Sequence, residues 1–180
     1  MGHLIGKDVY RALGRKIDGL TLRAPWNDTF HAILKELYSA EEADLVVRMP
    51  YGLATIEHIE RTTGYPRATL ERVLEGLCMK GLVLDVHMGD AYRYIPSPLA
   101  IGIFEFTMMR TGDGLNQKEW ARLFHDYMAS GVLWEANLGA GLGVQTNFCV
   151  IDANGGAAIF ETHNHGYQRL DASGTPEKYL

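Results

Sequence analysis

The chain has 180 residues, of which 47% are hydrophobic and 22% are charged, values that are typical of a globular protein and exclude general disorder. Its formal net charge of −5 argues against a strongly basic nucleic-acid binder, because affinity for phosphate depends on clustered Lys and Arg. The two cysteines, Cys78 and Cys149, exclude a disulfide framework and a four-cysteine zinc or iron–sulfur site within one chain.

The start of the chain and its most apolar stretch bear on localisation. The first residues lack a basic segment followed by a long apolar run, so we expect no signal peptide. Residues 99–109 are apolar, but they are too few to span a bilayer and they include Glu105. We therefore expect a cytoplasmic protein that does not enter a membrane.

Three amphipathic helices are predicted before Pro50. Residues 7–20 carry apolar side chains at helical spacing. A second helix follows Pro25, with Asn27 or Asp28 as its cap. The buried stripe of that helix consists of Phe30, Ile33, Leu34 and Leu37. A third helix begins after Ser39, which is followed three positions later by an acidic residue, as in a capping box.

The stretch 53–96 predicts a winged helix-turn-helix. Residues 55–63 form a first helix that Gly64 ends, and residues 67–80 form a second helix that Gly81 ends. Two strands, 82–88 and 91–95, flank a short turn at Gly89 and Asp90. Two helices joined by a tight turn and followed by a two-stranded wing are the order of elements in that motif.

The remaining residues complete the expected organisation. Residues 99–110 predict a strongly buried helix, and Asn116 caps another helix that runs to Ala129. The fold class is therefore mainly α with a small β-wing. We expect a helical domain at 1–130 that contains the winged unit, a glycine-rich junction at 131–145, and a β-hairpin tail at 146–180 around the turn residues 154–156.

The second helix of the winged unit holds the candidate nucleic-acid contacts. In a helix-turn-helix this helix usually enters the major groove. Arg67, Thr69 and Arg72 would lie on its exposed face, and Arg93 on the wing. Residues 55–95 carry five basic and six acidic side chains, so the unit is slightly acidic. This balance favours packing or protein contact over recognition of DNA, although DNA binding stays an alternative.

Glu161, His163 and His165 alternate along the tail and would share one face of a strand. Three such ligands could hold zinc, but no fourth ligand is evident, and alternation of polar residues at a surface is the favoured interpretation. Cys149 could act as a nucleophile only with a base within reach, and His163 is the candidate. A buried structural thiol is favoured for Cys149, and no catalytic residue or cofactor is expected.

Four phrases in the first 138 residues resemble the amino-terminal winged-helix region of bacterial 4Fe-4S ferredoxin-type proteins. These are GKDVYRAL at 6–13, LRAPW at 22–26, IGIFEFTMMR at 101–110 and KEWARLF at 118–124. In that family the region precedes a cysteine-rich cluster domain. The cysteine-rich part is absent here, so the resemblance does not extend to electron transfer or cluster binding.

Residues 146–180 resemble a fragment of the acyltransferase and peptidase branch of the N-terminal-nucleophile hydrolases. The phrase TNFCVIDANGGAAIFE at 146–161 carries the likeness. The nucleophile in that family is a new amino terminus created by self-cleavage. Cys149 does not match that position, so the resemblance assigns no catalytic residue, and the tail is interpreted as a fused fragment.

The favoured function is a non-catalytic winged-helix accessory or protein-interaction module, related to iron–sulfur redox proteins but without a cluster site. A protein partner is expected and DNA is possible. The alternatives are a DNA-binding transcriptional regulator and a fragment of an amide or acyl hydrolase. The oligomeric state stays open.

Overall fold

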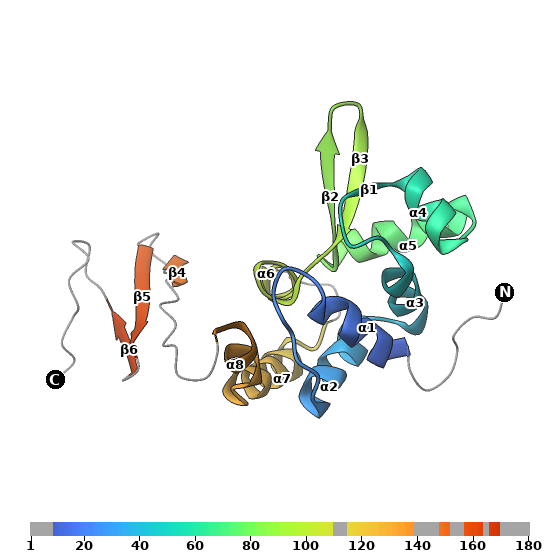
Figure 1. Cartoon of the computed structure of the whole chain (residues 1–180). Helices are drawn as coiled ribbons and strands as arrows, with labels where there is room; N and C mark the ends of the chain where they lie inside the picture. Colours follow the sequence, from blue (N-terminus) through green and yellow to red (C-terminus); the bar gives the residue numbers. More distant parts are fainter. Residues whose placement is uncertain (1–8, 110–114, 139–147, 152–156, 164–165, 170–180) are drawn as a thin grey trace. The chain divides into compact units, whose positions relative to one another are not determined.

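The computed structural model describes residues 9–109, 115–138, 148–151, 157–163 and 166–169. It divides into two units, Met1–Ala136 and Asn137–Leu180, which are described separately (Figure 1). The first unit is mainly helical and contains a small antiparallel sheet of three strands. This confirms the predicted class of a mainly helical protein with a small β-element.

Three helices occupy the segments where the sequence predicts them, and the second and third begin at the predicted caps. They are α1 (Val9–Asp18), α2 (Asp28–Leu37) and α3 (Ala40–Arg48). Asn27 caps α2, since its side chain accepts a hydrogen bond from the Phe30 N–H at 2.8 Å. Ser39 and Glu42 form the predicted capping box at α3. The four residues of the predicted α2 stripe are all buried, and α1 packs against both α2 and α3.

Helix α3 carries two buried carboxylates toward the elements that follow it. Glu42 accepts from the Lys80 ammonium at 2.7 and 2.8 Å. Asp44 accepts from the Tyr65 hydroxyl at 2.8 Å and from the Arg48 guanidinium at 3.1 Å. A buried carboxylate without donors is strongly unfavourable, so these bonds define how α3 meets the next two helices.

Those two helices are α4 (Ile56–Thr63) and α5 (Arg67–Met79). Gly64 follows α4 with a φ of 71°, the left-handed conformation that a side chain would disfavour. Leu70, Val73, Leu74 and Leu77 form the buried stripe of α5, whereas Cys78 is partly buried.

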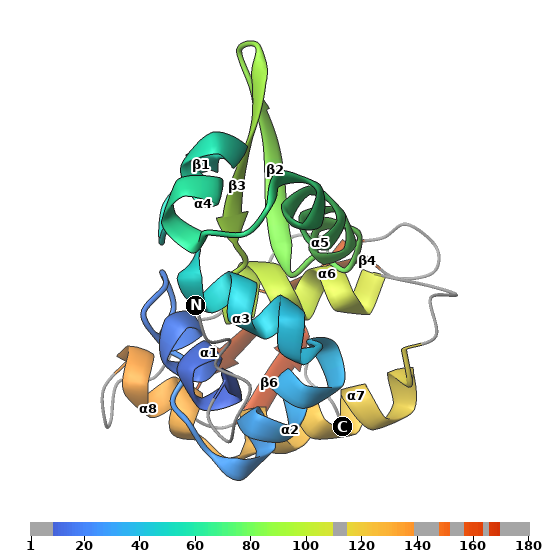
Figure 2. The same ribbon diagram turned by 90° about the vertical axis from the view of Figure 1, so that its right-hand side faces the viewer.

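A three-stranded sheet completes this region. Its strands are β1 (Ala54–Thr55), β2 (Val83–Met88) and β3 (Ala91–Pro96), in the spatial order β1-β3-β2. The predicted turn lies at Gly89, with a φ of 67°, between Met88 and Ala91, which pair. The sequence did not indicate β1, because two residues are too few to show a periodic pattern. Figures 1 and 2 both show the β2–β3 hairpin projecting away from the helices.

The segment after Pro98 differs from the prediction of one strongly buried helix over 99–110. It begins as a turn of π-helix, η1 (Leu99–Ile103), and continues as α6 (Phe104–Met109). The Ile103 N–H donates to the Pro98 carbonyl, five residues back, at 2.9 Å. The predicted strong burial holds for Leu99 and Ile103 but is wrong at the end of α6, where Met108 is 52% exposed and Met109 is 76% exposed. Residue 110 lies outside the described residues.

Helix α7 (Gln117–Ala129) begins at the predicted cap, Asn116. Its buried aromatic residues form stacks, with Phe124 4.2 Å from Phe104 and Tyr127 5.2 Å from Phe30 between ring centroids. A further helix, α8 (Val132–Leu138), occupies residues that the sequence analysis assigned to the glycine-rich junction. Leu133 of α8 is buried, so the helical unit extends beyond residue 130.

The second unit contains the strands β4 (Phe148–Ile151), β5 (Ala157–His163) and β6 (Gly166–Arg169). They pair antiparallel in the order β4-β5-β6. Residues 139–147, 152–156, 164–165 and 170–180 lie outside the described residues. The glycine-rich end of the junction and the turn at 154–156 fall among these residues, so the β-hairpin tail as a separate unit stays a prediction.

The Glu42–Lys80 pair supplies the first test of this fold. Glu42→Ala removes the carboxylate from a pair whose Glu42 side chain is 11% exposed, and it also breaks the capping box. We expect the free energy of unfolding to fall by about 3 kcal/mol, the usual cost of breaking a buried ion pair. Urea denaturation measures this loss.

The control is Glu119→Ala at the exposed pair with Arg122, where we expect a loss below about 1 kcal/mol. Equal losses in the two variants would contradict a central role for Glu42.

The same pair predicts a pH dependence. Burial alone would raise the pKa of Glu42, but hydrogen bonds from Lys80 and from the Ser39 N–H outweigh burial and lower it. A lowered pKa in the folded state stabilises the fold above the ordinary glutamate value of 4.5, and this contribution is lost as the pH falls through the folded pKa. We therefore expect the stability difference between the wild type and Glu42→Ala to shrink below pH 4.5. Denaturation series at several pH values measure it, and a difference that grows with acid would contradict the sign.

Candidate interaction surface

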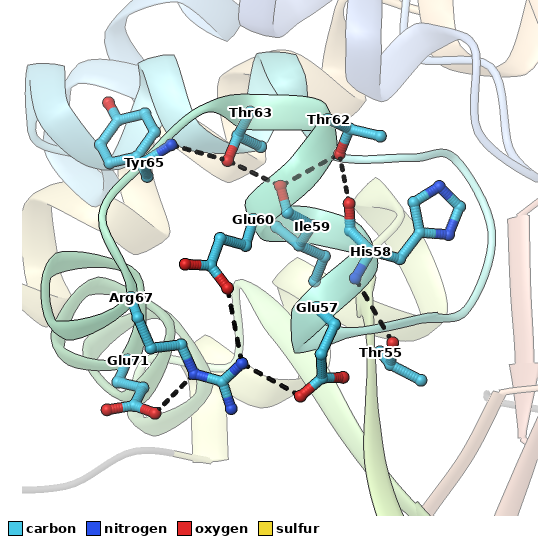
Figure 3. Close-up of polar contacts among 10 residues, drawn as sticks. All are labelled: Thr55, Glu57, His58, Ile59, Glu60, Thr62, Thr63, Tyr65, Arg67 and Glu71. Carbon is cyan, nitrogen blue, oxygen red and sulfur yellow. Dashed lines mark hydrogen bonds and ion pairs between the residues drawn. The ribbon is translucent and has the colours of Figure 1, made fainter.

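The turn between α4 and α5 is held by local hydrogen bonds and by one bond to α3. The Thr63 hydroxyl donates to the Ile59 carbonyl at 2.7 Å and accepts from the Tyr65 N–H at 3.3 Å (Figure 3). The Tyr65 hydroxyl donates to Asp44 at 2.8 Å. Burial raises the pKa of Tyr65 to about 12, and the bond to Asp44 acts in the same direction. The turn is thereby fixed to the helical core.

Arg67, the first residue of α5, is surrounded by carboxylates. Its guanidinium lies 2.8 Å from Glu71 on its own helix and 3.0 Å from Glu57 on α4. Glu60, also on α4, lies 3.7 Å away. Figure 3 shows the three acids approaching Arg67 from two helices. One positive charge therefore stands among three negative charges.

The pKa shifts of this cluster follow from these contacts. The hydrogen bonds from Arg67 to Glu71 and Glu57 raise the pKa of the guanidinium further above its ordinary value. The pKa of Glu57 is lowered, chiefly by its own backbone N–H and next by Arg67. With one guanidinium among three carboxylates, the cluster has an excess of negative charge.

Arg72 and Thr69 do not extend a basic surface from Arg67. Arg72 lies five positions after Arg67, which places it about 140° further around the helix. Its guanidinium donates to both carboxylate oxygens of Glu41 on α3, each at 2.9 Å. Thr69 is partly buried. The two arginines therefore point to different neighbouring helices.

Arg93 lies in the middle strand of the sheet, opposite Thr55 on β1 and Val86 on β2. It is partly buried, and its Nε is buried without a hydrogen-bond partner among the described residues. The described contacts do not bring the four candidate nucleic-acid contacts into one cluster.

The β2–β3 hairpin exposes large apolar side chains that the sequence analysis did not single out. Val86 is 39% exposed, Met88 is 46% exposed and Tyr92 is 52% exposed. The ring of Tyr92 contacts His87 edge to face, with 5.0 Å between the centroids. Period-2 alternation could have indicated that one face of the hairpin is exposed. It could not have shown that, among the described residues, no helix covers the end of the hairpin near Gly89.

The structure describes the surroundings of the Cys78 side chain, but for Cys149 it describes only the position in the strand. Burial raises the pKa of the Cys78 thiol to about 12, and Asp85 adds to the shift, so Cys78 is almost entirely protonated at neutral pH. Cys149 lies on β4 opposite Ile159 of β5. His163, its candidate base, stands opposite Gly166 of β6. The backbone register therefore does not pair Cys149 with His163.

The candidate metal ligands are described in part. Glu161 and His163 lie two positions apart on β5 and share a face of the strand. His165 lies outside the described residues. Within the described residues, no three His, Cys, Asp or Glu side chains come together as a metal site would require.

A cavity of about 330 Å³ lies beside α6 and α7. Its lining includes Met108, Leu115 and Trp120, and Lys118 is the charged residue in it. A single ammonium among mainly apolar side chains does not form an acid–base pair for catalysis.

No protein-family model, no curated protein and no solved structure matches this chain. Among the described residues, the helices are too short or too polar to cross a bilayer.

The environment of Cys78 predicts its reactivity. In a Cys149→Ser variant, alkylation at pH 8 reports on Cys78 alone. A pKa of about 12 in place of 9.0 lowers the thiolate fraction about a thousandfold, so native Cys78 should react about a thousand times more slowly than in the urea-unfolded chain. Timed mass spectrometry measures both rates. Similar rates in the folded and unfolded chains would contradict the buried thiol.

Proposed function

We propose that the helical unit is a non-catalytic winged-helix module that acts in the cytoplasm and binds protein rather than DNA. The order of α4, a tight turn, α5 and the β2–β3 hairpin supports a winged helix-turn-helix. The pairing of β1 with β3 supports it further, because it joins the hairpin to the start of α4.

The observation that carries the preference for protein is the acidic surround of Arg67. A guanidinium contributes less to phosphate binding when nearby carboxylates already pair with it. Glu57, Glu60 and Glu71 already neutralise Arg67, and they would repel an approaching phosphate. Arg72 is occupied by Glu41 in the same manner.

The exposed hairpin is the surface that we assign to binding. Val86, Met88 and Tyr92 place apolar area on an element that projects from the helices (Figure 2). Val86 and Met88 share one face of β2, whereas Tyr92 lies beside His87 on the other face. Exposed apolar side chains that gather on one face commonly mark protein contacts, and methionine adapts well to a partner's shape. Aromatic residues and methionine are also enriched in protein interfaces.

The likeness of residues 6–13, 22–26, 101–110 and 118–124 to 4Fe-4S ferredoxin-type proteins supports an accessory role beside a redox protein. Two cysteines cannot hold a four-cysteine cluster, so the module itself would carry none. We interpret residues 146–180 as a fused fragment similar to N-terminal-nucleophile hydrolases, to which we assign no activity.

Binding of duplex DNA tests the proposal. We expect the full chain not to bind a labelled random-sequence duplex at low salt in fluorescence anisotropy. The triple variant Glu57→Gln, Glu60→Gln, Glu71→Gln releases Arg67 and removes three exposed negative charges. It should gain weak binding that added salt abolishes.

The matched control is the double variant Glu119→Gln, Asp126→Asn, which releases Arg122 on α7 from two comparable ion pairs. This control should not bind DNA if binding requires a free arginine on α5, and not merely the removal of negative charge elsewhere on the protein. Low-salt binding by the wild type that Arg67→Ala and Arg72→Ala reduce would overturn the proposal in favour of a DNA-binding regulator.

A further inference from the structure

Strand β2 forms one edge of the three-stranded sheet. Among the described residues it pairs with β3 alone, because the spatial order is β1-β3-β2. Its pairing with β3 is one to one from Val83 to Met88, without a bulge. In Figures 1 and 2 the outer part of this hairpin stands clear of the helices.

The hydrogen-bond register shows which backbone groups face outward. The Ser97 N–H donates to the Leu82 carbonyl at 3.1 Å, so Leu82 is a hydrogen-bonded position of the ladder. Such positions alternate in an antiparallel pair. Leu84, Val86 and Met88 therefore direct their N–H and C=O groups toward β3. The groups of Asp85 and His87 point to the open edge.

This edge lacks lysine, proline and a bulge, and its one charged residue, Asp85, is the residue that an antiparallel copy can place opposite His87. Soluble proteins protect edge strands with lysine, proline, a bulge or a covering element. From Val83 to Met88 the sequence is VLDVHM, with neither lysine nor proline. Asp85 to Met88 are exposed, so the edge is accessible as well as unpaired.

The side chains of β2 are complementary to those of an antiparallel copy. Leu84, Val86 and Met88 lie on one face of the strand, and Asp85 and His87 lie on the other. A two-fold axis at Val86 places Asp85 of each copy opposite His87 of the other and Leu84 opposite Met88. If the two-fold axis passed through Asp85 instead, the two Asp85 carboxylates would face each other. If it passed through His87, the two imidazoles would face each other.

The hydrogen-bond register agrees with the charge pattern. When the pairing is centred on Val86, the outward-facing N–H and C=O groups of Asp85 in one copy meet those of His87 in the other copy. Asp85 and His87 then form a hydrogen-bonded pair. Val86 then meets its own copy at a non-hydrogen-bonded position, where side chains approach most closely. An isologous dimer requires self-complementarity of this kind.

We propose that β2 pairs with β2 of a second copy of the chain, antiparallel and centred on Val86, so that the two three-stranded sheets become one continuous sheet. This inference rests on the proposed function, because it names a second copy as the partner of the exposed hairpin. Backbone hydrogen bonds would hold the two strands together, and the Asp85–His87 pairs would select the register.

A charge exchange on the full chain tests the proposal by sedimentation equilibrium. The wild type should show a concentration-dependent equilibrium between monomer and dimer. Asp85→Lys places a cation opposite His87 at two symmetry-related pairs and should weaken the dimer about tenfold. Adding His87→Glu places a carboxylate opposite the new ammonium and should recover the wild-type affinity to within about threefold. Glu119→Lys on α7 is the matched control and should leave the dimer unchanged.

A cross-link tests the register independently of the affinity. Positions that face their own copy across a non-hydrogen-bonded pair lie about 4.5 Å apart at Cα, which suits a disulfide. Val86→Cys should therefore form a disulfide with its copy under mild oxidation, and peptide mapping should identify it. Asp90→Cys, in the turn, should not, because the two copies of position 90 lie at opposite ends of the paired strands.

The outcomes separate this inference from the proposed function. A wild type that stays monomeric at all concentrations, or a dimer that Asp85→Lys leaves unchanged, would overturn the pairing of β2. Neither result bears on the separate prediction that the full chain does not bind DNA. Binding of DNA would overturn the proposed function even if the dimer forms.

Discussion

The arrangement of the helical unit depends on two carboxylates that α3 buries against its neighbours. Glu42 receives the ammonium of Lys80 at the end of α5, and Asp44 receives the hydroxyl of Tyr65 in the turn before α5. Apolar packing alone tolerates small shifts between helices, whereas a buried charge that loses its donor costs several kcal/mol. The pairs thus hold both ends of α5 to α3. The capping box of α3 also uses Glu42, so one side chain links local and tertiary structure.

The same kind of pairing continues on the surface and shapes what the module can bind. Glutamates on α3 and α4 hold Arg72 and Arg67, which α5 would need for contacts with phosphate. Each exposed pair adds little stability by itself. Their larger effect is electrostatic, because they leave the α4–α5 surface acidic around Arg67. In the proposed function, the partner is therefore recognised through the apolar side chains and the backbone of the hairpin rather than through cationic side chains.

Much of the fold could be predicted because its boundaries depend on local chemistry. Asn27, Ser39 and Gly64 act on backbone groups within a few residues, so their roles are visible in the sequence. The Arg67–Glu71 pair at four-residue spacing could be expected for the same reason. The approach of Glu57 to Arg67 could not, because it depends on how the turn at Gly64 folds α4 back against α5. The exposure of α6 likewise depends on which neighbours it packs against, and no local pattern contains that information.

The hairpin combines a buried base with an exposed edge. At its base, Leu82 and Val83 are buried, and the Ser97 hydroxyl donates to the Gly81 carbonyl at 2.9 Å. Gly81 is required there, because a Cβ in its place would lie 2.3 Å from the Cβ of Phe106. A strand anchored in this way loses little conformational freedom when a second strand adds to it, so most of the free energy of the new hydrogen bonds remains available for binding. A flexible loop with the same residues would lose more conformational freedom on pairing. In the proposed dimer, the buried base of the hairpin therefore strengthens the pairing of its open edge.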